Sequence, residues 1–301
     1  MGIGRQGLLT VVLLLAVWTA RADECRPPGV ALALGSGGAA GLAHIAVLGV
    51  FDELGIRPEA IAGTSIGAIM GALYAAGLSA DEIEQVFRDF GGSALDPLSG
   101  LIGDNGPPGL SDLVEIDLAN GSFIDSDRFI DFIASRMEAR SFDQLRLPLY
   151  LVATDFWTGQ SHVFEEGDLL RAVQASMAVP GLFAPVKLDD KLLIDGGTSN
   201  PLPVDLLEGH DLVVAIDVTG ARQRETEGRP DVTDLLFSSF EIMQQSILRG
   251  SLQRHSVDIY IKPELTGIRM LHFDRVDAIL EQARPAAGEL RKQLQALIDC
   301  D

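Results

Sequence analysis

The clearest chemical signal in the chain is Ser65, which lies in a Gly-x-Ser-x-Gly turn, Gly63-Thr64-Ser65-Ile66-Gly67. An apolar run over residues 60–62 precedes the turn, and an apolar stretch of helical length, residues 68–76, follows it. A sharp strand-to-helix turn of this kind exposes a nucleophile, and glycines tolerate the close backbone approach that it requires. The N-terminus of the following helix also directs N–H groups toward negative charge that develops in acyl transfer. The alternative is a tight turn that only packs a helix on a sheet.

A glycine-rich loop, Gly35-Ser36-Gly37-Gly38-Ala39-Ala40-Gly41, lies between an expected buried strand over residues 30–34 and an apolar helix over residues 42–54. Converging backbone N–H groups in such a loop bind a phosphate or an oxyanion. A dinucleotide-binding loop requires an acid at the end of the next strand, but that strand ends in Thr64-Ser65. A P-loop requires Lys followed by Ser or Thr after the glycines, and this chain lacks it. The oxyanion interpretation fits better, because Ser65 supplies a nucleophile for the loop to serve.

A carboxylate, Asp195, follows a short apolar strand and precedes two glycines in Lys191-Leu192-Leu193-Ile194-Asp195-Gly196-Gly197. Taken alone, this is an ordinary Asp-Gly turn. A desolvated carboxylate is a stronger base than one in water, so a buried Asp195 near Ser65 could accept the serine proton. The competing arrangement is a Ser-His-Asp triad, for which chain order leaves three histidines without a motif of their own, His210, His255 and His272. His44 is expected to be a helix residue near the glycine loop rather than a proton carrier.

In this order, the motifs resemble the bacterial patatin-like phospholipases. The resemblance rests on the glycine loop, the serine turn, Ala175-Ser176-Met177-Ala178-Val179-Pro180-Gly181 and the Asp-Gly-Gly turn, and it covers residues 28–218. The segment over residues 257–263 is also similar to bacterial members related to neuropathy target esterase. Such enzymes hydrolyse acyl esters of lipids or phospholipids with a Ser–Asp dyad. The resemblance implies Ser65 as nucleophile, Asp195 as base, and an oxyanion hole made by the N–H groups of Gly37, Gly38 and Ile66.

The same resemblance implies a three-layer α/β/α fold with a central, mostly parallel sheet and a helical C-terminal tail. The further motif glycines that it implies are Gly35, Gly41, Gly63, Gly67, Gly196 and Gly197. One position departs from the family pattern, because Ala40 stands where the family usually has Arg or Lys. Loss of that cation could weaken the anchoring of the loop or the electrostatics of the hole. The alternative function is therefore a catalytically weak relative that binds lipid or a partner.

The chain starts with a segment typical of a secretory signal peptide. Residues 1–22 contain an apolar run, residues 8–17, and end in a small-x-small cleavage pattern, Ala20-Arg21-Ala22. We therefore expect an exported protein, periplasmic or secreted. The formal charge of −20 gives no bulk attraction to nucleic acid or to anionic membranes. The expected partner is a lipid or phospholipid ester, with transient contact to a membrane or micelle.

Two cysteines, Cys25 and Cys300, stand near the two ends of the exported chain. Chain termini often lie close together, and an oxidising compartment lets thiols pair, so we expect a disulfide between them. The alternatives are two separate thiols or pairing between molecules. No metal site or cofactor is expected, because no second Cys or His lies at ligand spacing.

Strands that alternate with helices predict a parallel-rich α/β sheet. We divide the chain into a signal peptide (1–22), a catalytic domain (23–218), and a linker with a helical C-terminal segment packed on that domain (219–301). Ser79 and Glu82 form a capping box that predicts the start of a helix, and Pro285 is expected to interrupt the last helical region. Residues 91–121 are rich in glycine and proline and predict either a cover over the site or a surface excursion.

Overall fold

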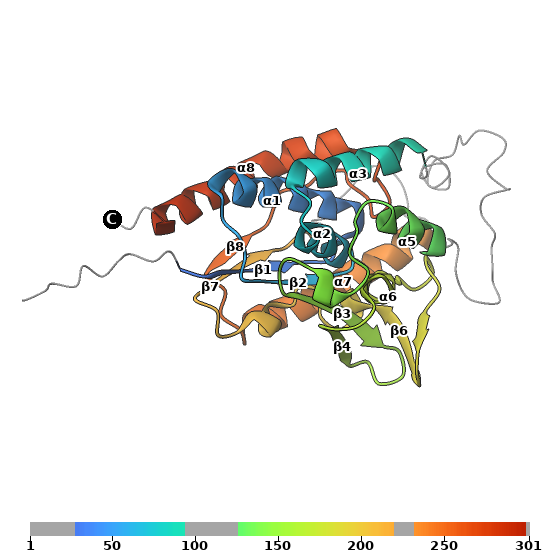
Figure 1. Ribbon diagram of the computed structural model, residues 1–301. Helices are drawn as coiled ribbons and strands as arrows, with labels where there is room; N and C mark the ends of the chain where they lie inside the picture. The colour runs from blue at the N-terminus through green and yellow to red at the C-terminus, as the bar shows by residue number, and fades with distance from the viewer. Residues whose placement is uncertain (1–27, 94–125, 220–231, 299–301) are drawn as a thin grey trace, which may run out of the picture.

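The computed structural model describes residues 28–93, 126–219 and 232–298 (Figure 1). Three expectations lie outside these residues: the signal peptide over 1–22, the Cys25–Cys300 disulfide, and most of the glycine- and proline-rich segment over 91–121. Within the described ranges, no helix combines the length and the hydropathy needed to span a bilayer.

A mixed sheet forms the centre of the molecule (Figure 1). Its hydrogen-bonded path runs β5-β6-β3-β2-β1-β7-β8, and β4 adds to β3. Strands β3, β2, β1, β7 and β8 are parallel, whereas β4, β5 and β6 run antiparallel to their neighbours. The strands are β1 Val30–Leu34, β2 Ala60–Thr64, β3 Leu149–Asp155, β4 Ser161–Phe164, β5 Val186–Leu188, β6 Lys191–Asp195, β7 Leu212–Ile216 and β8 Ile259–Ile261.

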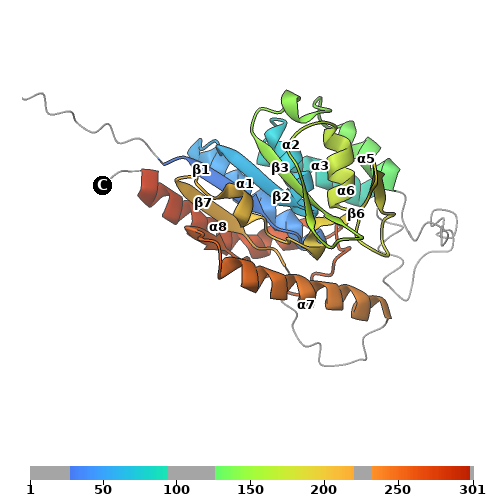
Figure 2. The same cartoon turned by 90° about the horizontal axis from the view of Figure 1, so that it is seen from below.

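Helices cover both faces of the sheet, as the predicted α/β class requires. On one face, α1, α2, α3 and α8 pack together, and α7 runs along the other face (Figure 2). The α-helices are α1 Ala43–Leu54, α2 Ile66–Ala75, α3 Ala80–Ser93, α5 Ser126–Ala134, α6 Leu169–Ser176, α7 Val232–Leu252 and α8 Val276–Ile298. Short 3₁₀ turns are η1 Gly38–Leu42, η3 Phe142–Gln144, η4 Gly196–Thr198 and η5 Val204–Leu207.

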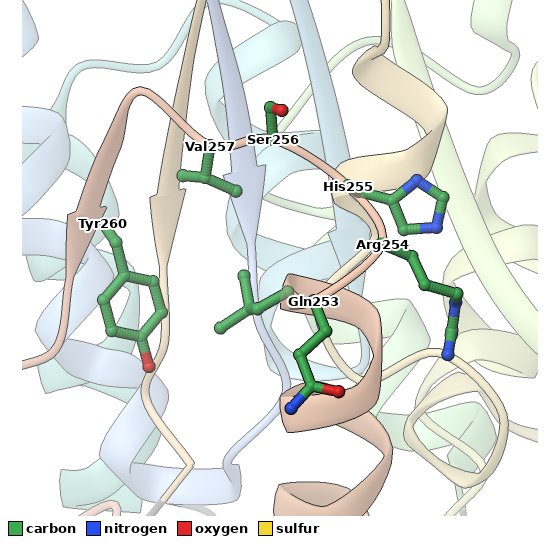
Figure 3. Close-up of a pocket in the computed structure, with 7 residues that line it drawn as sticks. Gln253, Arg254, His255, Ser256, Val257 and Tyr260 are labelled. Atoms are coloured by element: carbon green, nitrogen blue, oxygen red, sulfur yellow. The ribbon is translucent and has the colours of Figure 1, made fainter.

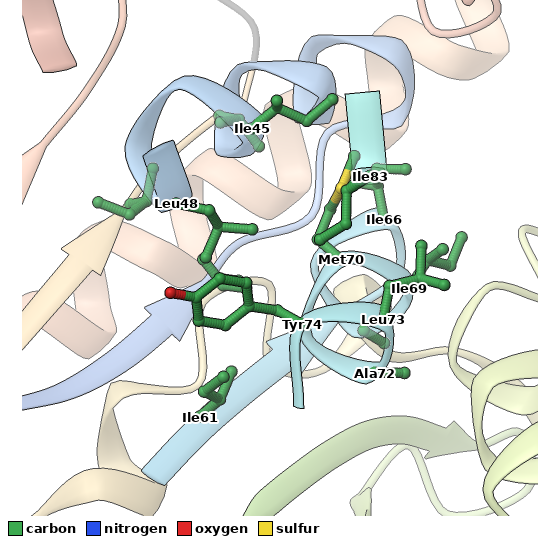
Figure 4. Packing of buried hydrophobic residues seen from close by; sticks show 14 of the residues in the cluster. Ile45, Leu48, Ile61, Ile66, Ile69, Met70, Ala72, Leu73, Tyr74 and Ile83 are labelled. Atoms are coloured by element: carbon green, nitrogen blue, oxygen red, sulfur yellow. The ribbon is translucent and has the colours of Figure 1, made fainter. Parts of the chain in front are cut away.

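The central strands are continuous apolar runs because both of their faces are covered. Every residue of β1, β2 and β7 is buried. One face of these strands presents large side chains such as Leu32, Ile61 and Val214 to the main core, into which α2 packs entirely (Figure 4). The other face presents mostly alanines, including Ala33 and Ala62, to a smaller cluster under α7 and η5. The small side chains on that face let the covering elements lie close to the sheet.

The sequence predicted the start of one helix and an interruption of another, and the structure confirms only the first. The capping box is confirmed, because the Glu82 N–H donates to Ser79 Oγ at 3.3 Å and the Ser79 N–H donates to Glu82 Oε2 at 2.8 Å. The expected interruption at Pro285 is wrong, because α8 continues through this residue. Buried residues lie on both sides of the proline, including Ile279 and Leu290, and α8 packs along α1. Tertiary packing therefore outweighs the hydrogen bond that proline cannot donate.

Residues beyond 218 contribute directly to the sheet. Strand β8 pairs in parallel with β7, and α8 packs on α1 and α3. The boundary that we drew at residue 218 therefore passes between two neighbouring strands of one sheet.

Candidate active site

Ser65 lies at the turn between β2 and α2 in a conformation that L-residues rarely adopt. Its φ is 57° and its ψ is −119°, and it is 7% exposed. Such backbone strain persists where the surrounding structure enforces it, and it concentrates at functional turns. A Cβ atom at Gly63 would collide with the Gly67 carbonyl, and one at Gly67 would collide with the Leu34 carbonyl. The glycines of the motif are therefore required by the tight fit of the turn against β1.

Strand β3 brings the carboxyl ends of β2 and β6 together. It pairs with β4 over residues 151–154, with β2 over 149–152 and with β6 over 153–155. A strand has two edges and β4 occupies one of them, so β2 and β6 share the other edge, end to end. In this register Thr64 lies opposite Val152 and Asp195 lies opposite Ala153. Ser65 directly follows Thr64, so consecutive residues of β3 bring the predicted nucleophile and base together.

Two buried hydroxyl groups fix the backbone on both sides of this junction. Ser176 Oγ accepts from the Ser65 N–H at 3.0 Å and donates to the Val152 carbonyl at 2.6 Å. Thr154 Oγ1 donates to the Asp195 carbonyl at 2.9 Å. Ser176 was expected only as part of the resembling segment, and no role was expected for Thr154. A local signal was present in both cases, because Thr154 follows the apolar residues 151–153 and Ser176 lies between Ala175 and Met177.

The side chain of Asp195 is fully buried and only partly hydrogen-bonded. Oδ1 accepts from the Gly197 N–H at 2.7 Å, whereas Oδ2 has no hydrogen-bond partner among the described residues. Burial raises the pKa of Asp195 to about 7, and the nearby Ser65 hydroxyl and the Gly197 N–H act in the opposite direction. The Ser65 hydroxyl is thus close enough to stabilise the carboxylate, although the two side chains do not form a hydrogen bond of normal length. Oδ2 remains available to receive a proton.

The glycine loop leaves the predicted oxyanion-hole donors without backbone partners. The N–H groups of Gly35, Ser36 and Ala39 donate to other carbonyls at 2.8–3.0 Å, whereas no backbone partner within the described residues accepts from Gly37. Gly38 begins η1 and Ile66 begins α2, and the first N–H groups of a helix have no acceptor within it. The N–H groups of Gly37, Gly38 and Ile66 are the three donors that the family resemblance implied for the oxyanion hole.

The loop carrying these donors is held against two neighbouring carbonyls. A Cβ atom at Gly37 would collide with the Val218 carbonyl, and one at Gly38 with the Met270 carbonyl. Gly38 also has a φ of 55°, in the left-handed region. Only glycine fits both positions without displacing the loop.

The four remaining motif glycines also lie at close contacts. Gly35 faces the Ile216 carbonyl, Gly41 faces the Ile66 side chain, Gly196 faces the Val152 carbonyl and Gly197 faces the side chain of Gln244. These contacts tie the three sequence motifs to one another and to α7.

His44 and Ala40 lie beneath the glycine loop. His44 is fully buried, its Nε2 lies 2.9 Å from the Gly35 carbonyl, and burial lowers its pKa to about 4. It is therefore a neutral donor to the loop above that pH, which agrees with its expected place near the site. Ala40 is also buried and belongs to the apolar core. The loop thus presents an apolar contact where a cation was expected from the resemblance.

A second polar group, Asp217, supports the other side of the loop, and no role was expected for it from the sequence. Asp217 is buried at the end of β7 and accepts from Tyr260 Oη and Lys262 Nζ, each at 2.5 Å. It also accepts from the Thr219 N–H at 2.8 Å and from the Thr219 hydroxyl. Val218, between Asp217 and Thr219, carries the carbonyl that faces Gly37. The segment over residues 257–263, noted only for its resemblance, therefore supplies two side chains that hold the wall of the loop.

The three histidines available for a triad have partners elsewhere. His210 Nδ1 lies 3.4 Å from Glu59 Oε2, and His255 Nδ1 lies 2.5 Å from Glu208 Oε1. His272 Nδ1 accepts from the Arg269 N–H at 3.0 Å. Among the described residues, the structure brings none of these histidines into hydrogen-bond contact with Ser65 or Asp195.

A cleft of about 400 Å³ lies beside His255, at the end of α7 (Figure 3). It is lined by residues 252–257 and Tyr260, and neither Ser65 nor Asp195 lines it. The cleft is therefore separate from the site built on β3.

Comparison with protein families gives a match over most of the sheet and the site. The sequence matches the family described as patatin-like phospholipase over residues 32–208. This range contains the glycine loop, Ser65 and Asp195.

Individual relatives agree with this match. An uncharacterized NTE family protein of Mycobacterium tuberculosis is 33% identical over 209 residues, which cover 68% of this chain and 54% of the relative. Human patatin-like phospholipase domain-containing protein 6 is 33% identical over 210 residues, which cover 68% of this chain and 14% of that protein. The chain thus spans about half the length of the first relative. The crystal structure of VipD from Legionella pneumophila aligns with a TM-score of 0.50 at 15% identity, over 89% of this chain and 67% of VipD, and supports the fold.

Proposed function

Because this chain belongs to the patatin-like phospholipase family, we propose that it hydrolyses carboxylic ester bonds of lipids or phospholipids, with Ser65 as nucleophile and Asp195 as general base. The observation that carries this proposal is the register of β3, which sets a strained serine beside a buried carboxylate with an unpaired oxygen. The chemistry follows from that arrangement.

In the first half-reaction, Ser65 Oγ attacks the ester carbonyl carbon and its proton moves to Asp195 Oδ2. The carbonyl oxygen becomes an oxyanion, which would be stabilised by the N–H groups of Gly37, Gly38 and Ile66. Each such donor typically contributes about 3 kcal/mol to transition-state stabilisation. The tetrahedral intermediate then expels the alcohol, which takes the proton from Asp195 and leaves an acyl group on Ser65.

In the second half-reaction, water attacks the acyl carbonyl carbon and gives a proton to Asp195. The second tetrahedral intermediate breaks its bond to Ser65 Oγ, which recovers the proton, and the carboxylic acid leaves. Asp195 can serve in both directions because burial holds its pKa at about 7, close to the pH at which a base must accept and return a proton.

The test is hydrolysis of a short-chain p-nitrophenyl ester and of a phospholipid by Ser65→Ala. We expect a loss of at least about 10³-fold for both substrates, the scale for removal of a nucleophile. Ser135→Ala is the matched control, because Ser135 is exposed in the turn after α5 and should retain full activity. Retention of more than a tenth of the activity by Ser65→Ala would overturn the assignment.

The alternative of a weak relative has its own support in the apolar residue Ala40. A fluorophosphonate probe distinguishes the two proposals, because it labels an activated serine even when turnover is slow. Labelling at Ser65 together with rapid ester hydrolysis supports the enzyme. An unlabelled protein that still binds lipid would support the alternative.

A further inference from the structure

Helix α7 shows an unusual distribution of its side chains. Leu235, Leu236, Ile242 and Met243 are exposed by 52%, 67%, 60% and 56%. Their spacing places them along one face of the helix. Ser239 and Ser246 lie between them on the same face, whereas Ser238, Gln244 and Ser251 are buried together with Leu248. A helix that only covers a sheet rarely exposes four large apolar side chains on one face, so this face requires an explanation other than folding.

Helix α7 packs next to the candidate active site through its buried side. The buried Gln244 contacts Gly197, two residues after Asp195, and α7 packs on η4. The contact of α7 with η4, which directly follows Asp195, places the helix next to the strand ends that carry Ser65 and Asp195 (Figure 2). A surface that bound the apolar face would therefore approach the molecule at the end that carries the site.

The charge pattern specifies the kind of surface. From Leu235 to Leu248, Glu241 is the single charged residue in the sequence, and the whole chain carries a formal charge of −20. Attraction to an anionic surface by charge is therefore absent, and apolar burial must supply the affinity. A zwitterionic or uncharged lipid surface meets both conditions.

We infer that the face formed by Leu235, Leu236, Ile242 and Met243, which we call the α7 apolar face, docks the protein on a zwitterionic or uncharged lipid surface. This inference rests on the proposed function, because it explains how a lipid ester would reach the site from an aggregate. The helix lies in the plane of the lipid surface, with its apolar side chains among the acyl chains and Gln244 still packed against Gly197.

The experiment measures co-sedimentation of the exported chain, residues 23–301, with phosphatidylcholine vesicles, in a Ser65→Ala background so that the lipid stays intact. Leu236→Ser combined with Met243→Ser should lower the vesicle partition coefficient at least about tenfold, since two large side chains no longer enter the acyl region. Leu297→Ser on α8 is the matched control, because it removes an exposed leucine from the opposite side of the sheet and should leave partitioning unchanged. Replacing part of the lipid by anionic phosphatidylglycerol should not increase binding.

Activity measurements on the wild-type background complete the test. The double variant should lose vesicle hydrolysis in proportion to its partitioning and keep hydrolysis of a soluble p-nitrophenyl ester within about twofold. Equal partitioning of the Ser65→Ala protein and the double variant would overturn the inference, as would binding that depends on anionic lipid. A lipid-free dimer that the double variant dissociates would assign the face to a second copy instead. Because binding is measured without catalysis, failure of the proposed function would leave this result interpretable.

Discussion

Replacing Asp195 by Asn should abolish ester hydrolysis and at the same time stabilise the protein at alkaline pH. Burial raises the pKa of Asp195 from 3.8 to about 7, so the folded protein binds this proton more tightly than the unfolded chain does. The free-energy cost of ionising Asp195 in the folded protein is absent below pH 3.8, grows as the pH rises toward 7, and is constant above pH 7. Asparagine has a similar shape and never ionises, so it removes the penalty.

The size of the effect follows from the shift. One pKa unit corresponds to about 1.4 kcal/mol, so the ionised Asp195 lowers the free energy of unfolding by about 4 kcal/mol at pH 8. At pH 5 the penalty is roughly 2 kcal/mol, so the advantage of Asp195→Asn should grow by roughly 2 kcal/mol between pH 5 and pH 8. The asparagine Oδ1 can still accept from the Gly197 N–H. Its amide N–H groups lack an acceptor where Oδ2 now lies, which costs roughly 1–3 kcal/mol at every pH.

The assay is urea unfolding of wild type and Asp195→Asn at several pH values from 5 to 8. His44 contributes stability above pH 6.5 that is lost as the pH falls toward 4, but this term is the same in both proteins and cancels. A difference in unfolding free energy that does not change with pH would refute the assignment of a buried carboxylate with a raised pKa. Hydrolysis by the wild type should rise with pH through about 7, because Asp195 must be ionised to accept the proton.

Three further predictions concern groups around the site. Ser176→Ala should lower the turnover number of the soluble ester about tenfold with little change in KM, because the Ser65 N–H loses its acceptor; an unchanged turnover number would show that the elbow holds its geometry without it. Replacing His210, His255 or His272 by Gln, one at a time, should leave most of the activity. Loss of activity to the level of Ser65→Ala in any folded variant of this set would show that a triad, not a dyad, operates. Protein exported through the secretory route should show no free thiol after denaturation without reductant, and two titratable thiols would contradict a bond between Cys25 and Cys300.

The elements that could be predicted are those whose sequence signals are local. Strands β1, β2 and β7 are uninterrupted apolar runs, and glycines mark the turns at Ser65 and Asp195. The approach of these two residues could be expected only from the family resemblance. Its physical cause is the sharing of one edge of β3 by two strands, and pairing between distant strands leaves no signal within either segment.

The supporting residues were harder to predict for the same reason. Asp217 directly follows a buried strand, and two of its four hydrogen bonds come from Tyr260 on β8 and from Lys262 just after it, some forty residues later in the sequence. The expected break at Pro285 failed because the packing of α8 on α1 is a tertiary effect that a rule about single residues does not include.

The end-to-end meeting of β2 and β6 on β3 has a consequence for how the site comes into existence. Neither Ser65 nor Asp195 can take its place until β3 has paired with both partners, and β3 lies between them in the sequence. A nascent chain that has reached Ser65 therefore carries the serine motif but no site. Synthesis must continue past residue 195 before the two groups can meet. Reactivity toward lipid esters would then appear late, as one event with closure of the sheet, and partly made chains in the cell would be unable to attack its membranes.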